Sequence, residues 1–369
     1  MQINFRKGYS VTSHILSGSS PGNLYRILAD NQFRIGKPYR KKLLKTIFIV
    51  LLSTPNILLE RLLFNRKIRN TKVTAPVFIL GYPRSGTTHL IYLLSKDTRF
   101  GWCKTYECLG PHVIFTFGRV LRFIAQRALP KTRPMDNMPL GADLPKEEEF
   151  AIANMGIESM VNGLYFPQKF SEYTNRFVLF KGDAREKSNW KRNHLFLSQK
   201  LTLKNNNKTL LLKSPFDTGR VKELLELYPD ARFIHIYRNP LSVYASNEKL
   251  YEGVLPQTAF HEVGDEEMKQ HVLYSYKAVY EKYFSEKNLI PKDKLIEVRY
   301  EDFIGKELSY LENIYRQLHL TGFEEMRSVY EKMLEKNRHY QTNQHSMTQE
   351  LEDEVRREWA FAFDAFTDY

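Results

Sequence analysis

Four short, mainly apolar runs stand out along the chain, each ending at a turn or a charged residue. They cover residues 77–80, 209–213, 232–237 and 295–300. Apolar runs of this length are typical of strands buried on both faces, and the longer stretches of helical spacing between them predict strand–helix–strand units. Because such crossovers join parallel strands, we expect an α/β fold with a mostly parallel central sheet flanked by helices.

Apolar residues at helical spacing, interrupted by proline, glycine and asparagine, predict the remaining elements. Helices are expected at 23–31, 113–129, 150–160 and 269–286, a turn at 97–100, and long loops at 130–149 and 253–265. The first of these loops holds four prolines, which makes it a candidate substrate loop. It ends in Glu147, Glu148 and Glu149, whose charges would complement the dipole of the following helix.

The first apolar run leads into Gly-Tyr-Pro-Arg-Ser-Gly-Thr-Thr at 81–88, and helical spacing resumes after it. A loop between a strand and a helix can point backbone N–H groups at an anion, and the helix N-terminus adds partial positive charge. Gly86 would let the backbone approach a ligand closely. Ser85, Thr87 and Thr88 offer hydroxyl donors. The stretch therefore predicts a phosphate-binding loop.

This loop differs from the phosphate-binding loop of nucleoside triphosphatases. That motif needs a lysine where this chain has Thr87, and here the cation stands three positions earlier, at Arg84. Triphosphatases also hold Mg²⁺ with an acidic residue at a strand end, whereas the run 232–237 ends in Arg238. Both strand ends therefore favour an anionic ligand that is bound without a metal ion.

Four motifs, in this order along the chain, resemble those of sulfotransferases that use 3′-phosphoadenosine 5′-phosphosulfate (PAPS). They are Pro-Arg-Ser-Gly-Thr-Thr at 83–88, Leu-Leu-Lys-Ser-Pro-Phe at 211–216, Arg-Asn-Pro-Leu-Ser-Val-Tyr-Ala-Ser at 238–246 and Val-Arg-Tyr-Glu-Asp at 298–302. The second is similar to a strand end of tyrosylprotein sulfotransferases and their bacterial relatives. The resemblance spans about residues 75–303. It implies a P-loop-NTPase-like sulfotransferase fold, with a catalytic domain at 73–369 and a separate segment at 1–72.

The resemblance also implies a role for each motif. Arg84 would bind the 5′-phosphate and the departing oxygen, and Lys213 would neutralise the same charge. Arg238 and Ser246 would hold the 3′-phosphate, and Tyr300 would contact the nucleotide. The implied donor-binding residues are Arg84, Ser85, Gly86, Thr87, Thr88, Arg238, Ser246 and Tyr300. A structural ion pair for Lys213 and a core position for Tyr300 are the alternatives.

Sulfuryl transfer is an in-line displacement, so it needs positioning, cations for the developing charge and a base for the acceptor hydroxyl. Glu107 lies 23 residues after Arg84, similar in placement to the base glutamate of tyrosylprotein sulfotransferases. His112 is the second candidate, because histidine is the usual base in cytosolic sulfotransferases, and Glu148 is the third. The base stays open among these residues. Because a sulfuryl group carries less charge than a phosphoryl group, side-chain cations could suffice without a metal.

Positive charge is concentrated near the N-terminus. The segment 37–72 holds ten Lys or Arg against one Glu, which accounts for +9 of the net +13. Its charge-free run 46–59 is shorter than the roughly 20 residues of a membrane span, and Pro55 is expected to break it. Because cations enclose this apolar run, we expect 43–64 to lie on an anionic membrane surface rather than on nucleic acid. A helix packed on the catalytic domain, a lid and a true span are the alternatives.

These features predict an enzyme that moves a sulfuryl group from PAPS to an acceptor hydroxyl and releases 3′,5′-ADP. The apolar N-terminal segment favours a lipid- or sterol-like alcohol over a carbohydrate or a peptide tyrosine. A nucleotide kinase or triphosphatase and a non-enzymatic membrane scaffold are the rival classes. Cys103 and Cys108 are expected to be free thiols in a reducing compartment. Residues 1–10 show no apolar signal segment, so we expect a cytoplasmic protein, peripheral on a membrane.

Overall fold

The protein forms two compact units, each built from separated parts of the chain. The computed structural model describes residues 1–8, 14–133, 138–336 and 347–366. Unit 1 is made of Met1–Lys72, Cys103–Asn207 and Glu248–Ser275. Unit 2 is made of Val73–Trp102, Lys208–Asn247 and Tyr276–Tyr369. A boundary between units falls after Lys72, but unit 1 also contains parts of the predicted catalytic domain 73–369, so the division into 1–72 and 73–369 stays a prediction.

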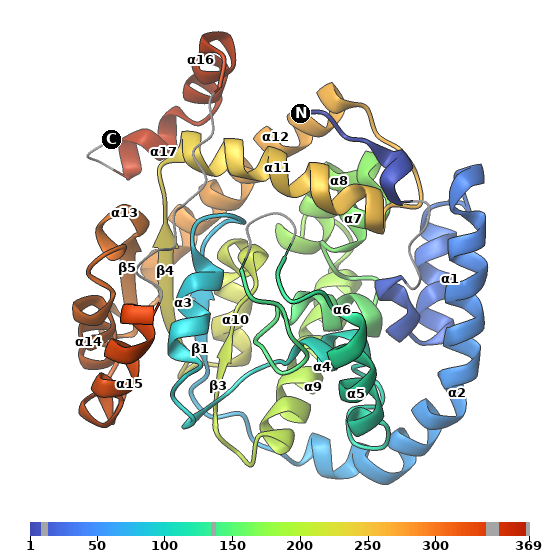
Figure 1. The fold of residues 1–369 in the computed structure, drawn as a ribbon, viewed down its shortest axis with the longest axis horizontal. Helices are drawn as coiled ribbons and strands as arrows, with labels where there is room; N and C mark the ends of the chain where they lie inside the picture. Colours follow the sequence, from blue (N-terminus) through green and yellow to red (C-terminus); the bar gives the residue numbers. More distant parts are fainter. Residues whose placement is uncertain (9–13, 134–137, 337–346, 367–369) are drawn as a thin grey trace. The chain divides into compact units, whose positions relative to one another are not determined.

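Unit 2 contains a five-stranded parallel sheet with the strand order β2-β3-β1-β4-β5 (Figure 1). The strands are β1 (Val77–Leu80), β2 (Phe100–Gly101), β3 (Thr209–Leu212), β4 (Arg232–Tyr237) and β5 (Leu295–Arg299). Every residue of β1 is fully buried, as its continuous apolar pattern predicts. The predicted α/β class and its four strands are thus confirmed.

Helices cover this sheet, with α3 packed on β1 and α14 packed on β5. The helices that lie wholly in unit 2 are α3 (Thr87–Leu94), α10 (Val221–Leu227), α13 (Tyr300–Phe303), α14 (Glu307–Gln317), α15 (Phe323–Lys336), α16 (Gln349–Glu358) and α17 (Ala360–Ala365). The turn predicted at 97–100 is wrong at its last residue, because Phe100 begins β2. A strand of two residues is too short to show an alternating pattern.

Unit 1 is helical in its described residues. Its helices are α1 (Pro21–Asp30), α2 (Arg40–Arg69), α4 (Thr105–Leu109), α5 (Gly118–Ala128), α6 (Glu149–Met155), α7 (Asn162–Tyr165), α8 (Phe170–Tyr173) and α9 (Ala184–Lys204). The helix predicted at 113–129 starts only at Gly118, because the N–H groups of Phe115 and Thr116 donate to the Glu60 carboxylate. The helix predicted at 150–160 ends at Met155, and the N–H of Met160 turns back to the side chain of Glu149.

Two long helices, α11 (Pro240–Thr258) and α12 (Asp265–Glu286), have residues in both units. The loop predicted at 253–265 is therefore wrong for most of its length. Helix α11 continues through Pro256 to Thr258, whose hydroxyl bonds to the carbonyls of Val254 and Leu164. In the predicted loop 130–149, residues 134–137 lie outside the described part of the chain.

Helix α2 is a single element of 30 residues that passes through Pro55 (Figure 1). The prediction that Pro55 breaks the apolar run is wrong. Pro55 has no N–H to donate to the Leu51 carbonyl. Beside this gap, the hydroxyls of Ser53 and Thr54 both donate to the Val50 carbonyl of the same turn. Packing also holds the helix on both sides of the proline, since Val50 and Ile57 are buried. Tertiary contacts therefore override the local helix breaker.

Candidate active site

The loop after β1 turns the chain sharply into α3. Gly81 and Gly86 have φ values of 140° and 100°, and Arg84 has a φ of 77°, which is strained for a residue with a side chain. A Cβ atom at Gly81 would lie 2.3 Å from the carbonyl oxygen of Ile236 in β4. The loop is therefore pressed against the neighbouring strand, and only glycine fits at its first position.

Side chains from other parts of unit 2 fix this loop. The Gly81 N–H donates to Thr218 Oγ1 at 2.8 Å, and the Asn247 side-chain amide donates to the Pro83 carbonyl at 3.0 Å. Sequence reasoning missed both supporting residues. No local pattern marks Thr218 or Asn247, because their role arises only when folding brings 208–247 beside the loop.

Helix α3 begins directly at the end of the loop, with Gly86 as its N-cap. No side chain among the described residues caps this end, so the first N–H groups of the helix are available to an anion. Thr87 is buried and Thr88 is partly exposed. The predicted phosphate-binding loop therefore has the backbone geometry of an anion site.

Two cations border the loop. The Arg84 Nε donates to Ser246 Oγ at 2.8 Å, from the loop to α11. Lys213 follows β3, the neighbour of β1, and is only 3% exposed. Its Nζ lies 3.5 Å from Thr88 Oγ1 at the start of α3. A buried ammonium group at a helix N-terminus is a costly arrangement that an anion would stabilise.

A third cation lies at the end of β4, on the other side of β1. The Arg238 guanidinium carbon is 4.6 Å from the centroid of the Tyr300 ring. That ring packs on the loop, because a Cβ at Gly86 would lie 2.3 Å from Tyr300 Cδ2. Within the described residues, the buried Arg238 Nε makes no hydrogen bond, and Glu301 Oε1 lies 4.0 Å from it. Arg238 therefore keeps donor capacity for a ligand.

All residues predicted to bind the donor lie in unit 2: the loop residues follow β1, Arg238 follows β4, Tyr300 follows β5, and Ser246 lies in α11. In open parallel sheets, ligands bind at the carboxyl ends of the strands. The bond between Arg84 and Ser246 joins two residues that the sequence assigned to different phosphates of the donor. The arrangement can therefore hold one ligand that carries two separate anionic groups.

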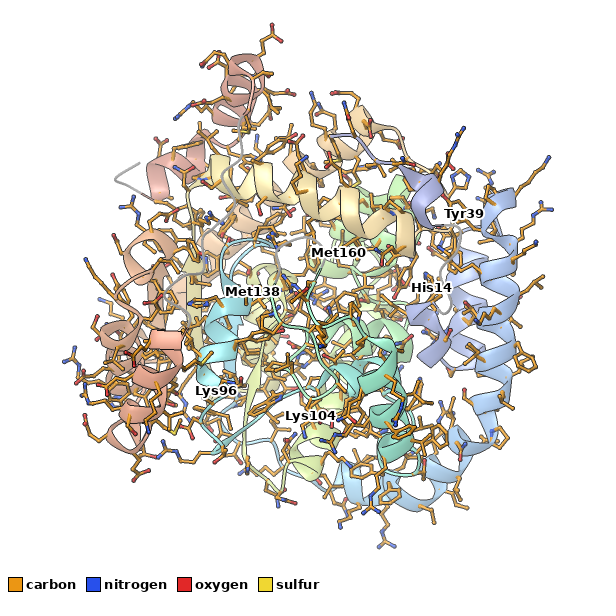
Figure 2. All side chains as sticks on the ribbon, in the orientation of Figure 1. His14, Tyr39, Lys96, Lys104, Met138 and Met160 are labelled. Atoms are coloured by element: carbon orange, nitrogen blue, oxygen red, sulfur yellow. The ribbon has the colours of Figure 1, made fainter. Side chains whose placement is uncertain are left out.

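The first base candidate, Glu107, lies in α4 of unit 1, and Lys104, which precedes that helix, is labelled in Figure 2. The Glu107 carboxylate accepts hydrogen bonds from the Lys104 N–H at 2.9 Å and from the Tyr106 hydroxyl at 3.0 Å. Its side chain is 1% exposed, and burial raises its pKa above the ordinary value of a glutamate. A carboxylate of raised pKa is a stronger base.

The other base candidates have different surroundings within unit 1. The His112 Nε2 donates to the Asn154 carbonyl at 3.0 Å, so the proton resides on Nε2 and only Nδ1 is basic. Burial and then the charge of Lys200 lower the pKa of His112 to about 3, which makes it a weak base at neutral pH. Glu148 is buried at the start of α6. Glu149 lies in the first turn of α6, where its charge complements the helix dipole, and its carboxylate also accepts hydrogen bonds from Ser159 and Met160.

His89 and the two cysteines contact residues of their own units. His89 Nε2 lies 3.7 Å from Glu307 Oε1, and its ring packs edge-on against Phe303 in unit 2. Cys103 and Cys108 are buried free thiols of unit 1, with their sulfur atoms 3.2 Å apart. The reducing compartment inferred from them stays a prediction.

Comparison with known sequences finds sulfotransferases. A model of the sulfotransferase family matches residues 76–325. Omega-hydroxy-beta-dihydromenaquinone-9 sulfotransferases of Mycobacterium bovis and Mycobacterium tuberculosis are 30% identical to this chain over 345 residues. The matched region covers 92% of this chain and 88% of each relative.

Solved structures share the fold. Sulfotransferase STF1 from Mycobacterium tuberculosis has a TM-score of 0.67 at 16% identity, covering 91% of this chain and 90% of its own. Sulfotransferase STF9 from Mycobacterium avium has a TM-score of 0.63 at 19% identity, covering 85% of this chain and 82% of its own. At these identities the likeness shows the fold alone.

Proposed function

This chain belongs to the sulfotransferase family, and from that premise we propose that it moves the sulfuryl group of PAPS to the hydroxyl of a hydrophobic alcohol. Sulfate transfer follows from the family. The identity of the donor, the class of acceptor and the roles of individual residues are the proposal.

The position of Arg238 is the main support for PAPS as the donor. A nucleotide with phosphate only at its 5′ position would need the loop, α3 and Lys213. Arg238 lies beyond them at the end of β4, stacked on Tyr300 and with an unsatisfied Nε among the described residues. A guanidinium is well suited to a phosphate group, and PAPS differs from other adenine nucleotides in its 3′-phosphate. We therefore assign Arg238 to the 3′-phosphate.

The proposed reaction is an in-line displacement at sulfur. The acceptor oxygen attacks, the bond from sulfur to the 5′-phosphate oxygen breaks, and 3′,5′-ADP leaves with the bonding pair. Negative charge that grows on the departing oxygen would be stabilised by Arg84, Lys213 and the N-terminus of α3. Because these groups already supply positive charge, we propose that no metal ion is needed.

Glu107 is the proposed base that takes the acceptor proton. Among the candidates in unit 1, Glu107 has a raised pKa, whereas the pKa of His112 is lowered to about 3. A base is most effective when its pKa approaches the working pH, which favours the glutamate. The proton would leave the acceptor hydroxyl for a carboxylate oxygen of Glu107.

The relatives support the proposed acceptor class. By name they act on an omega-hydroxylated menaquinone derivative, which is a hydroxyl on a hydrophobic lipid. At 30% identity the exact acceptor can differ, so we propose only a hydrophobic, lipid-like alcohol for this chain. Carbohydrate and tyrosine hydroxyls are the competing acceptors in any screen.

Calorimetry with 3′,5′-ADP, 5′-AMP and ATP–Mg²⁺ tests the donor. We expect tight binding of 3′,5′-ADP only, and binding about 10- to 100-fold weaker for Arg238→Ala, since a hydrogen bond to a charged group contributes about 1.5–3 kcal/mol. Arg316→Ala is the matched control, because Arg316 is an exposed arginine of unit 2 that bonds to Asn313. It removes the same charge away from the strand ends.

Two outcomes would contradict the proposal. If ATP–Mg²⁺ binds and 3′,5′-ADP does not, the donor is a nucleoside triphosphate. If Arg238→Ala and Arg316→Ala weaken binding equally, Arg238 acts only through overall charge. Sulfate transfer from PAPS that is abolished by EDTA and restored by Mg²⁺ would separately overturn metal independence.

A further inference from the structure

Helix α2 of unit 1 has an outward face made of large apolar side chains. Each of them is between 45 and 82% exposed. They are Leu44, Phe48, Leu51, Leu52, Leu58, Leu59, Leu62 and Leu63, and we call them the apolar face of α2. At about 100° per residue these positions fall on one side of the helix. An exposed patch of this kind marks an interaction site.

The opposite face of α2 is buried although it carries charged and polar residues. Lys42, Thr46 and Glu60 are each no more than 5% exposed. The Lys42 Nζ donates to the Gln257 carbonyl at 3.0 Å, and Glu60 forms a buried ion pair with Lys200. Rotating the helix to hide its leucines would leave these charges without partners. The exposure of the apolar face is therefore fixed by the fold.

A second apolar face lies on α5, which follows a residue that contacts α2. Phe64 of α2 stacks on Phe115, with ring centroids 4.7 Å apart, and α5 starts three residues after Phe115. Val120, Phe123 and Ile124 of α5 are 43 to 53% exposed. Their spacing puts them on one face of that helix. Unit 1 thus exposes an apolar face on α2 and another on α5; Figure 1 shows where the two helices lie.

Cations stand at both ends of the apolar face. Arg40, Lys41 and Lys45 are exposed at its start, and Arg66 and Arg69 are exposed at its end. Glu60 is the only acidic residue of α2, and it is buried. An anionic lipid surface complements this pattern, because headgroups meet the cations while acyl chains meet the leucines. Pairing with a second copy would instead bring cationic ends together whichever way the helices run.

The contacts of α2 also decide how it would meet a membrane. Residues Lys37–Arg69 are long and apolar enough, by length and composition alone, to span a bilayer. Crossing would strip Glu60 from Lys200 and from the Phe115 and Thr116 N–H groups. We therefore propose that the apolar faces of α2 and α5 dock on an anionic lipid membrane, with α2 lying in its surface. This docking depends on unit 1 alone and not on the proposed donor or acceptor.

Vesicle flotation of the full chain tests the proposal. We expect binding to vesicles of phosphatidylcholine with phosphatidylglycerol, and weaker binding to phosphatidylcholine alone or in high salt. Leu52→Glu/Leu62→Glu should weaken binding at least about tenfold, because two acidic groups would enter the apolar layer. Leu289→Glu/Val329→Glu is the matched control, since both side chains are exposed apolar residues of unit 2 and the charge change is the same. It should float like the wild type.

A variant without the cations at the start of α2 tests their part in membrane binding. Arg40→Gln/Lys41→Gln/Lys45→Gln should reduce binding to the anionic vesicles at least about tenfold and leave binding to phosphatidylcholine unchanged. Equal flotation of wild type and Leu52→Glu/Leu62→Glu, or no flotation of either, would overturn the proposal. A dimer that dissociates in the same variant, without vesicle binding, would make the face a contact between copies. Protein that resists alkaline extraction would overturn the in-plane arrangement.

Discussion

The two units place their cations by opposite means. Unit 2 buries its apolar residues in the sheet and brings Arg84, Lys213 and Arg238 to neighbouring strand ends, where backbone geometry fixes them. Unit 1 does the reverse in α2, which buries Lys42 and Glu60 while its leucines face outwards. A small anion selects precise geometry, whereas a lipid surface selects a broad apolar area with charges at its edges. In our proposals the same residue types therefore serve two kinds of recognition.

The largest effect should come from testing whether unit 1 also contributes chemistry. We expect Glu107→Gln to lower kcat by about 10²–10⁴, because it removes the base and keeps the side-chain shape. Burial raises the pKa of Glu107, so wild-type kcat/KM should fall as pH drops through a value above that of an ordinary glutamate. Below that pKa the carboxylate is protonated and cannot accept the acceptor proton. The acid limb should disappear in Glu107→Gln.

His112→Asn is the control for this prediction. If His112 were the base, the acid limb would lie near its pKa of about 3, and this variant would lose the activity that Glu107→Gln keeps. The melting temperature of each variant should be measured with its rate, because Glu107 also accepts hydrogen bonds from Lys104 and Tyr106 and its substitution can affect stability. If both variants kept full activity, neither Glu107 nor His112 would be the base, and Glu148 would be the remaining candidate of unit 1.

The site of unit 2 was largely predictable from the sequence, whereas the surface of unit 1 was predictable only in part. Strands β1, β3 and β4 are continuous apolar runs, and parallel pairing puts their ends together whatever the details of packing. The face that α2 exposes depends on Lys200, Phe115 and Gln257, which are distant in the sequence. The cluster of cations and apolar residues indicated a membrane surface, but Pro55 predicted a break in the apolar run where tertiary contacts keep one continuous helix.

The next effect concerns the ion pair that orients α2. Glu60→Gln should lower the free energy of unfolding of unit 1 by about 3–5 kcal/mol, because it leaves Lys200 buried without its partner. Burial already lowers the pKa of Lys200, and loss of the Glu60 charge should lower it further. Urea denaturation measures the change, and hydrogen exchange of α2 shows whether this helix opens first.

The double variant Glu60→Gln/Lys200→Met makes this test specific. It removes both charges, so it should be clearly more stable than Glu60→Gln alone. An unfolding free energy of Glu60→Gln equal to that of wild type would mean that packing alone orients α2. Buried charge would then not explain why α2 of unit 1 exposes its leucines.

The smallest effect tests how closely the loop of unit 2 must fit. Gly86→Ala puts a Cβ 2.3 Å from Tyr300 Cδ2 and forces a residue with a side chain to a φ of 100°. We expect 3′,5′-ADP binding to weaken by about 1–3 kcal/mol in calorimetry, because strain at this position displaces the loop or the ring. Gly253→Ala is the control, since a Cβ there meets nothing within 4 Å and its helix should gain stability. Tyr300 is itself a proposed donor contact, so Gly86→Ala/Tyr300→Leu is compared with Tyr300→Leu alone. In that background the clash is gone and the φ strain stays, so Gly86→Ala should cause a smaller loss. No further loss from Gly86→Ala in the Tyr300→Leu background would assign the whole effect to the ring, and no loss in Gly86→Ala itself would mean that the loop adapts to its ligand.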